Sequence, residues 1–263
     1  MSGTVTAEIR FINPEWKHRK VPPVIGDRAS RRAHTTKHKV PVESARGAET
    51  GLDTTGFTLT RHKPGMTDFG DKSAVKTTYY EEVAGVVKRL AGADEVFVTH
   101  HLIRTEDRSD FLTAYARFAH CDYDITDPEP YSERALAERR EALDASRQWT
   151  FAWYNTWQPI DRPAIRNPLA LIDARSLDPG DILPYQYSGS YASGRGSMPL
   201  FSPDLRFWYV PGMTEEEMLV FKQLDTRPGR ALACPHTSFD IEVPPATPGR
   251  RSIEVRMMCA FGS

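Results

Sequence analysis

Ala119-His120-Cys121-Asp122-Tyr123 is the stretch around which this sequence is organised. It follows a strand-like run, Phe111 to Phe118, and alternate side chains of a strand share a face, so His120 and Asp122 are expected to point the same way. One more imidazole from a distant strand would complete a 2-His-1-carboxylate triad, and Cys234-Pro235-His236-Thr237 offers one downstream. Such a triad leaves half of an octahedral Fe(II) open for oxygen and a co-substrate. The His-x-Asp spacing alone is a weak signal, so its weight depends on the rest of the chain.

The composition is that of an ordinary globular protein. The 263 residues are 40% hydrophobic and 26% charged, and the formal net charge of −1 gives no general case for a nucleic-acid partner. No apolar run approaches the ~20 residues of a membrane span, and the start of the chain has no signal-peptide core. Three cysteines, Cys121, Cys234 and Cys259, are too few for a disulfide framework. We therefore expect a cytoplasmic protein without a membrane or nucleic-acid partner.

Residues 1–50 are polar and rich in basic clusters, and they predict an extended N-terminal arm with irregular structure. No aromatic residues interleave with these charges, as a stacking platform for nucleic acid requires. An arm that wraps the domain or lines a homodimer contact is the better interpretation. Residues 51–263 show no clear linker and no internal repeat, so they predict a single domain.

Two helices and a series of short strands are predicted within that domain. The helices span Ser73 to Leu90 and Tyr131 to Ser146, each with an apolar stripe. The run Tyr187 to Ser197, rich in Gly and Ser, predicts a loop. Short strands punctuated by prolines favour a sandwich or barrel. The predicted strands are Gly56 to Thr60, Asp94 to Ile103, Gln148 to Trp157, Leu169 to Arg175, Phe207 to Val210, Met218 to Leu224 and Ile253 to Phe261.

Several runs keep a familiar order and spacing from about residue 50 to residue 263. They are Ala119-His120-Cys121-Asp122-Tyr123, the helix start at Tyr131-Ser132, Asn155-Thr156-Trp157-Gln158-Pro159-Ile160, Asn167 to Ser176, Trp208 to Thr214, Phe221-Lys222-Gln223-Leu224-Asp225, Pro235 to Asp240, and Arg250 to Arg256. Together they resemble the CmcJ/AsaB/NvfI-like hydroxylase/desaturase family of non-heme Fe(II)/2-oxoglutarate-dependent oxygenases. The resemblance implies a mainly β fold with flanking helices, the double-stranded β-helix (jelly roll, cupin-like).

The same resemblance implies the chemistry. His120, Asp122 and His236 would bind Fe(II), with 2-oxoglutarate as co-substrate and O2 as oxidant, and no catalytic residue is expected beyond the metal centre. A ferryl intermediate would hydroxylate, desaturate or oxidatively rearrange a small molecule of secondary metabolism. The adjacent His100 and His101 point to opposite faces of their strand and cannot both bind one metal, although one of them could support a ligand.

The far carboxylate of 2-oxoglutarate needs a cation with fork geometry, which arginine supplies. Arg250 and Arg256 both follow His236, and both could share a strand face that reaches the cavity. The alternative for Arg256 is an ion pair with a glutamate. Thr237 could add a hydrogen bond to the co-substrate.

Four residues are candidates for the wall of a substrate cavity, although core packing is the simpler interpretation for the aromatic ones. They are Asn155, Trp157, Trp208 and Tyr209. Two other functions remain open from the sequence. One is a cupin-like iron dioxygenase that does not use 2-oxoglutarate, and the other is a non-catalytic jelly-roll accessory or binding partner of a biosynthetic enzyme.

Overall fold

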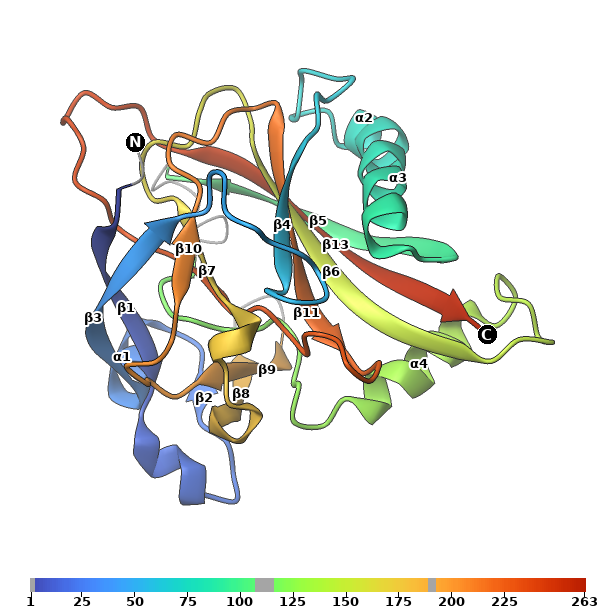
Figure 1. The fold of residues 1–263 in the computed structure, drawn as a ribbon, viewed down its shortest axis with the longest axis horizontal. Helices are drawn as coiled ribbons and strands as arrows, with labels where there is room; N and C mark the ends of the chain where they lie inside the picture. Colours follow the sequence, from blue (N-terminus) through green and yellow to red (C-terminus); the bar gives the residue numbers. More distant parts are fainter. Residues whose placement is uncertain (1–2, 107–115, 189–192) are drawn as a thin grey trace.

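Two five-stranded β-sheets and one smaller sheet form the framework of the described residues (Figure 1). The computed structural model describes residues 3–106, 116–188 and 193–263. The first sheet has the order β1 (Val5–Ile12), β3 (Thr35–Ser44), β10 (Phe207–Tyr209), β7 (Leu169–Ile172) and β12 (His236–Ser238). The second has the order β4 (Phe57–Arg61), β11 (Glu217–Asp225), β6 (Trp149–Pro159), β13 (Arg251–Gly262) and β5 (Glu95–Thr105). The small sheet pairs β2 (Val24–Ile25), β8 (Ile182–Ser188) and β9 (Ser193–Pro199).

The two large sheets pack on each other through one hydrophobic cluster. Leu171 and Trp208 of the first sheet meet Trp157 and Phe221 of the second sheet there. Alternation along β6 turns Asn155 and Trp157 towards this interior, because successive side chains of a strand point to opposite faces. The expected mainly β jelly roll with flanking helices is confirmed.

The outer face of the second sheet is covered by one continuous helical segment (Figure 1). This segment consists of α2 (Lys72–Ala74), a π-helical turn (Val75–Tyr79) and α3 (Tyr80–Ala91), as predicted. The helix predicted up to Ser146 is shorter, since α4 (Glu129–Arg139) ends early and the chain turns after it. The remaining α-helix is α1 (Arg28–His34). No helix in the described ranges is both long and apolar enough to cross a lipid bilayer.

The N-terminal fifty residues are not irregular, so that prediction was wrong. β1 pairs antiparallel with β3 along its whole length, and the end of β3 pairs in parallel with β10. Ile9 and Phe11 are buried on one side of β1, and Val40 and Val42 are buried on one side of β3. This alternation is a strand signal that the basic residues between the apolar ones obscured. The predicted boundary of the domain at residue 51 remains a prediction.

An ion pair links the end of β3 to the start of β11. Arg46 meets Glu217 through two contacts, Nη1 to Oε1 at 2.7 Å and Nη2 to Oε2 at 2.9 Å. The hydrogen bond from Arg46, with further help from Thr214, lowers the pKa of Glu217 from 4.5 to about 2. The unfolded state therefore binds this proton near pH 4.5 and the folded state only near pH 2.

We expect this pair to stabilise the protein fully above pH 4.5 and to lose its contribution as the pH falls towards 2. Because the pair is partly exposed, solvent screening reduces the effect to about 1 kcal/mol. Glu217→Gln should remove that part of the pH dependence when the free energy of unfolding in urea is measured between pH 3 and 6. The matched control is Glu216→Gln, since the Glu216 side chain is 51% exposed beside Lys63. The prediction is wrong if the free energy of unfolding changes with pH by the same amount in the wild type and in Glu217→Gln.

Candidate metal centre

The backbone brings His120 and His236 side by side. The N–H of His120 donates to the carbonyl of His236 at 3.1 Å, and the N–H of His236 donates to the carbonyl of His120 at 2.9 Å. Cys121 makes the next bridge, to Ser197 of β9. The segment that carries the first two predicted ligands is thus held between β12 and β9.

Only part of the strand predicted before this segment lies among the described residues. Of the range 111–118, residues 111–115 lie outside the described residues, and Ala116 to Phe118 belong to no strand. The strand prediction is wrong for those last three residues. Their backbone contacts are irregular, because Ala116 accepts from Ser238 while Ala119 donates to Arg10. Two bridges from neighbouring strands therefore orient the ligands, instead of a long strand of their own.

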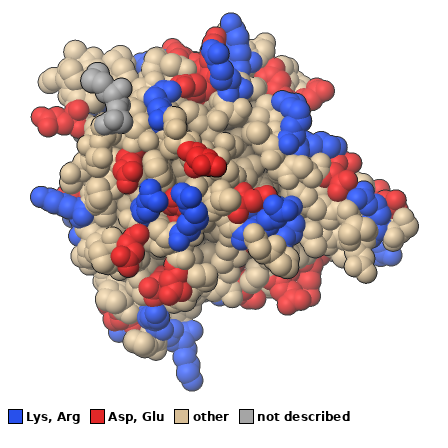
Figure 2. All heavy atoms as spheres, viewed as in Figure 1, with Lys and Arg blue, Asp and Glu red and all other residues tan. Residues whose placement is uncertain are grey.

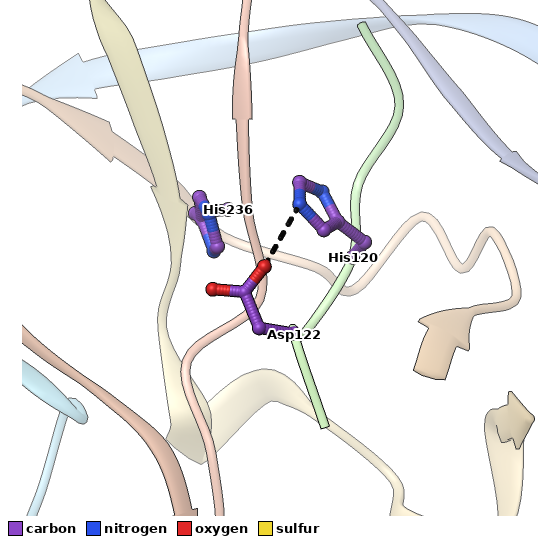
Figure 3. A group of neighbouring side chains, drawn as sticks. All are labelled: His120, Asp122 and His236. Carbon is purple, nitrogen blue, oxygen red and sulfur yellow. Dashed lines mark ion pairs between the residues drawn. The ribbon is translucent and has the colours of Figure 1, made fainter. Parts of the chain in front are cut away.

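His120, Asp122 and His236 converge on one point (Figure 3). One potential ligand atom from each of the three lies within 4.8 Å of the others. Nε2 of His120 is 3.6 Å from Oδ1 of Asp122, and the two imidazole centroids are 4.4 Å apart. All three side chains are buried, with exposed fractions below a tenth. Two imidazoles and one carboxylate with open positions form a ligand set suited to Fe(II).

Neighbouring groups hold the ligands in place. The carbonyl of Phe118 lies 3.0 Å from Nδ1 of His120, which leaves Nε2 of that ring to face Asp122. Asn155 donates from Nδ2 to Oδ2 of Asp122 at 2.7 Å, and Arg256 donates from Nη2 to Oδ1 at 2.8 Å. Hydrogen bonds of this kind orient metal ligands and tune their basicity.

The local charges set protonation states that suit a metal ion. Burial, together with the nearby His120, lowers the pKa of His236 to about 3. Burial acts to raise the pKa of Asp122, but Arg256 and the two imidazoles outweigh it and hold that pKa well below its usual range. At neutral pH, His236 is neutral and Asp122 is ionised. These are the states in which the two groups bind metal.

Arg256 is hydrogen-bonded to the carboxylate of Asp122. Its Nε donates to Oε1 of Glu254 at 3.0 Å while its Nη2 reaches Asp122. Burial acts to lower the pKa of Arg256, but these two carboxylates outweigh it and raise the pKa. The ion pair with a glutamate, which was the alternative expected for this arginine, is therefore present.

A cavity opens beside the two histidines. The side chain of Arg250 reaches this cavity, and the residue is 2% exposed. Its Nη1 donates to Oγ of Ser238 at 2.7 Å and to the carbonyl of Asn167 at 2.5 Å. Thr237 lines the same cavity. The lining residues are Arg104, Ala116, His120, Trp157, Leu169, His236, Thr237, Ser238, Arg250 and Glu254.

The four predicted wall residues separate into three groups. Trp157 lines the cavity, and Asn155 lies behind the triad with its amide on Asp122. Trp208 and Tyr209 are absent from the lining formed by the described residues. Trp208 donates from Nε1 to Asp173 at 3.1 Å, and Tyr209 packs edge-on against Phe239. The structure places both aromatic side chains in hydrophobic clusters, in line with the core interpretation.

Sequence reasoning did not single out two residues at this site. Arg104 of β5 lines the cavity, and Gln223 of β11 contacts both ligand segments. Arg104 had no signal beyond its place on a predicted strand. Gln223 lies in one of the runs that carried the family resemblance, and this was the signal that could have found it. His100 and His101 lie outside the triad, and Nδ1 of His101 lies 2.8 Å from the hydroxyl of Tyr80.

This chain is similar in sequence to one described protein family and to named fungal enzymes. A family model described as "Oxidoreductase/YMDC permease-like domain" matches residues 10–260. The alpha-ketoglutarate-dependent dioxygenase phiK of a fungus (strain ATCC 74256) is 30% identical over 236 residues, which cover 84% of this chain and 83% of phiK. The hydroxylase/desaturase CTB9 of Cercospora beticola is 32% identical over 240 residues, which cover 80% of this chain and 72% of CTB9.

A solved structure shares the fold. The iron and alpha-ketoglutarate-dependent endoperoxidase NvfI superimposes with a TM-score of 0.82 and covers 99% of both chains, at 24% sequence identity. At that identity the likeness is evidence for the fold alone. It agrees with the two packed sheets described above.

Proposed function

Because this chain belongs to the oxidoreductase family that the matching model describes, we propose that it is an Fe(II)- and 2-oxoglutarate-dependent oxygenase of a small organic molecule. The observation that carries this function is the convergence of His120, Asp122 and His236 beside a cavity. The relatives with substantial coverage are named as dioxygenases and as hydroxylase/desaturases. Hydroxylation, desaturation or oxidative rearrangement of a secondary metabolite is the matching range of reactions.

The three ligand residues fit Fe(II) by their chemistry and protonation. His120, Asp122 and His236 would hold the ion, which with 2-oxoglutarate and O2 supplies the oxidising power to remove hydrogen from carbon. The protein holds Asp122 ionised through Arg256 and keeps His236 neutral by burial. Trp157 and Leu169 contribute apolar wall to the same cavity, which limits the access of water.

Arg250 is the arginine that we propose for the far carboxylate of 2-oxoglutarate. It lines the same cavity as His120 and His236, whereas Arg256 is engaged by Asp122 and Glu254. Ser238, hydrogen-bonded to Arg250, supplies a hydroxyl beside it, and Thr237 supplies another in the cavity wall. A guanidinium can bind a carboxylate through two parallel hydrogen bonds.

The direct test is the conversion of 2-oxoglutarate to succinate by the anaerobically reconstituted Fe(II) protein after addition of O2. Succinate formation that requires both Fe(II) and O2 is expected, with stimulation by the true substrate. Oxygen uptake with a substrate but without succinate would favour the iron dioxygenase that does not use 2-oxoglutarate. Binding to a biosynthetic enzyme that survives removal of the metal, with no oxygen uptake, would favour the accessory partner.

Arg250→Met is expected to raise the KM for 2-oxoglutarate by about 100-fold, because the variant leaves a carboxylate in a buried site without its cation. Arg250→Lys should recover only part of the loss, since an ammonium lacks the planar fork. Steady-state succinate formation against 2-oxoglutarate concentration measures both. Arg251→Met is the control, because the neighbouring Arg251 pairs with Asp161 at the surface. An unchanged KM in Arg250→Met would reassign the co-substrate site.

Three further aspects remain proposals. We propose a cytoplasmic location, which the three free and buried cysteines support. On the face seen in Figure 2, acidic and basic side chains are interspersed, which supports the absence of a nucleic-acid partner.

A homodimer through the edge strand β1 would appear as twice the 29.7 kDa mass in sedimentation velocity.

A further inference from the structure

Strand β11 carries a β-bulge beside the triad. Its register against β6 shifts between Lys222, which lies opposite Tyr154, and Leu224, which lies opposite Trp153. Gln223 is the extra residue between these two pairs. Bulges re-aim individual side chains and are over-represented next to active sites. The bulge therefore gives Gln223 a direction that regular alternation would not.

The Gln223 side chain touches two of the three ligand residues. It is fully buried, and its Oε1 accepts from the backbone N–H of Asp122 at 2.9 Å. Its Nε2 lies 3.4 Å from Nδ1 of His236. The ring of Phe221 packs against the same imidazole, with 4.8 Å between the centroids. One amide thus spans two segments that come from distant parts of the chain.

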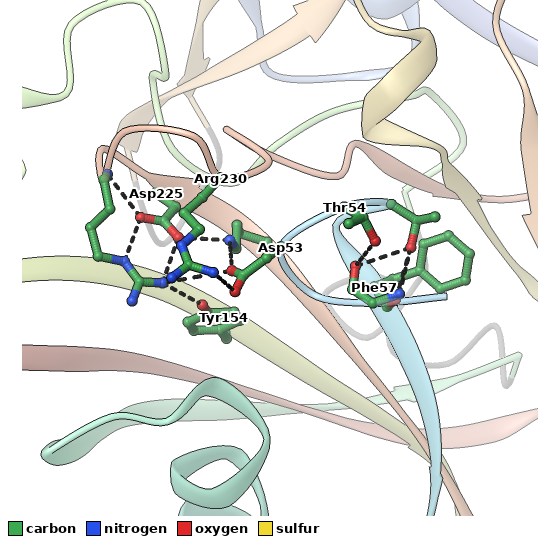
Figure 4. Close-up of polar contacts among 10 residues, drawn as sticks. Asp53, Thr54, Phe57, Tyr154, Asp225 and Arg230 are labelled. Carbon is green, nitrogen blue, oxygen red and sulfur yellow. Dashed lines mark hydrogen bonds and ion pairs between the residues drawn. The ribbon is translucent and has the colours of Figure 1, made fainter. Parts of the chain in front are cut away.

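An ion-pair network fixes the strand on both sides of the bulge (Figure 4). Nζ of the buried Lys222 is 2.6 Å from Oδ2 of Asp225 and 3.0 Å from Oδ1 of Asp53. Arg227 also pairs with Asp225, at 2.7 Å. The carbonyl of Lys222 accepts from the N–H of Cys234, two residues before His236. The bulge and the third ligand therefore belong to one cross-linked unit.

We propose that Gln223 is a positioning residue of the metal centre. Its Oε1 holds the main chain at Asp122 through the hydrogen bond from that residue's N–H, and its buried side chain lies against the imidazole of His236. Loss of a group that orients a metal ligand weakens metal binding by about 10–100-fold. The inference rests on the proposed function, because it concerns how the Fe(II) ligands are held.

The test compares metal affinity with stability in the full-length protein. Mn²⁺, a redox-stable substitute for Fe(II), is titrated without 2-oxoglutarate, and free Mn²⁺ is followed by electron paramagnetic resonance. Gln223→Met keeps the side-chain length and removes the amide, so it should weaken Mn²⁺ binding by about 10–100-fold. The visible spectrum of the Co²⁺ form should also change, since it reports ligand geometry. Gln223→Ser, which is shorter and polar, should show the same two effects and serves if the methionine variant does not fold.

Gln158→Met is the matched control. Gln158 is an equally buried amide on β6, hydrogen-bonded to Tyr79 and near His62, away from the triad. Its replacement should lower the free energy of unfolding and leave the Mn²⁺ affinity and the Co²⁺ spectrum unchanged. Wild-type affinity and an unchanged spectrum in a folded Gln223 variant would overturn the inference. Absence of Mn²⁺ binding by the wild type would instead count against the proposed function and its Fe(II) site.

Discussion

Asp122→Ala is expected to abolish succinate formation and to weaken Mn²⁺ binding by more than about 100-fold. Replacing a residue that only hydrogen-bonds to a metal ligand weakens binding by at most roughly 100-fold. Asp122 supplies the only oxygen ligand of the triad, and it also neutralises the buried guanidinium of Arg256. Removal of the carboxylate takes one negative charge from between the two imidazoles and leaves Glu254 as the remaining described carboxylate on the Arg256 guanidinium. The lost ligand and the lost negative charge both weaken the binding of a divalent cation, so they act in the same direction.

The measurement pairs a Mn²⁺ titration with succinate formation in the presence of Fe(II), 2-oxoglutarate and O2. Asp240→Ala is the control, because Asp240 pairs with Arg117 through a largely exposed side chain. The control should bind Mn²⁺ as the wild type does. The proposed centre is wrong if Asp122→Ala retains wild-type Mn²⁺ affinity while it unfolds cooperatively.

Asp225→Ala is expected to destabilise the protein by about 3–5 kcal/mol, since it removes one partner of a buried ion pair. The Lys222 side chain is 0% exposed, and Asp225 lies 2.6 Å from its ammonium. Asp225 also receives two hydrogen bonds from the guanidinium of Arg227. The remaining partner of Lys222, Asp53, is shared with Arg230 and partly exposed, so it compensates only in part.

Urea denaturation followed by circular dichroism gives the free energy of unfolding for this comparison. Asp161→Asn is the reference, because it removes one charge of a surface ion pair with Arg251, where such pairs contribute roughly 0–1 kcal/mol, and keeps a residue that tolerates the positive φ at this position. A loss in Asp225→Ala no larger than that of the reference would show that the buried network is not needed for stability. Asp225→Ala should also weaken Mn²⁺ binding if the bulge depends on this anchor.

The sequence was sufficient for the parts of this protein that depend on local periodicity. The short runs at β6 and β13, separated from their neighbours by Pro and Gly, and the apolar stripe of α3 predicted these elements within a few residues. The spacing of His120 and Asp122 predicted that both side chains point to one place, and the structure brings them together with His236. The third ligand followed from the order of the family runs, since no local pattern selects it.

Other parts depend on pairing between distant segments, which the sequence does not display. The Gly- and Ser-rich run from Tyr187 to Ser197 was predicted as a loop, yet outside the undescribed residues 189–192 it pairs as the β8–β9 hairpin. Gln223 gains its role from a register shift, which exists only once β11 lies beside β6. The proposal of Arg250 instead of Arg256 for the co-substrate likewise rests on the contact of Arg256 in β13 with Asp122.

The paired backbones of His120 and His236 have a consequence for the order of folding. The two residues are separated by 116 positions in the chain (236 − 120), yet each N–H donates to the other's carbonyl. Contacts of such large sequence separation form slowly, because loop closure must precede them. We therefore expect the site that would bind iron to be completed late in folding, after β12 has paired with β7. We expect added Mn²⁺ to slow unfolding and to leave the main refolding rate unchanged, because the ligand residues have not yet come together in the transition state.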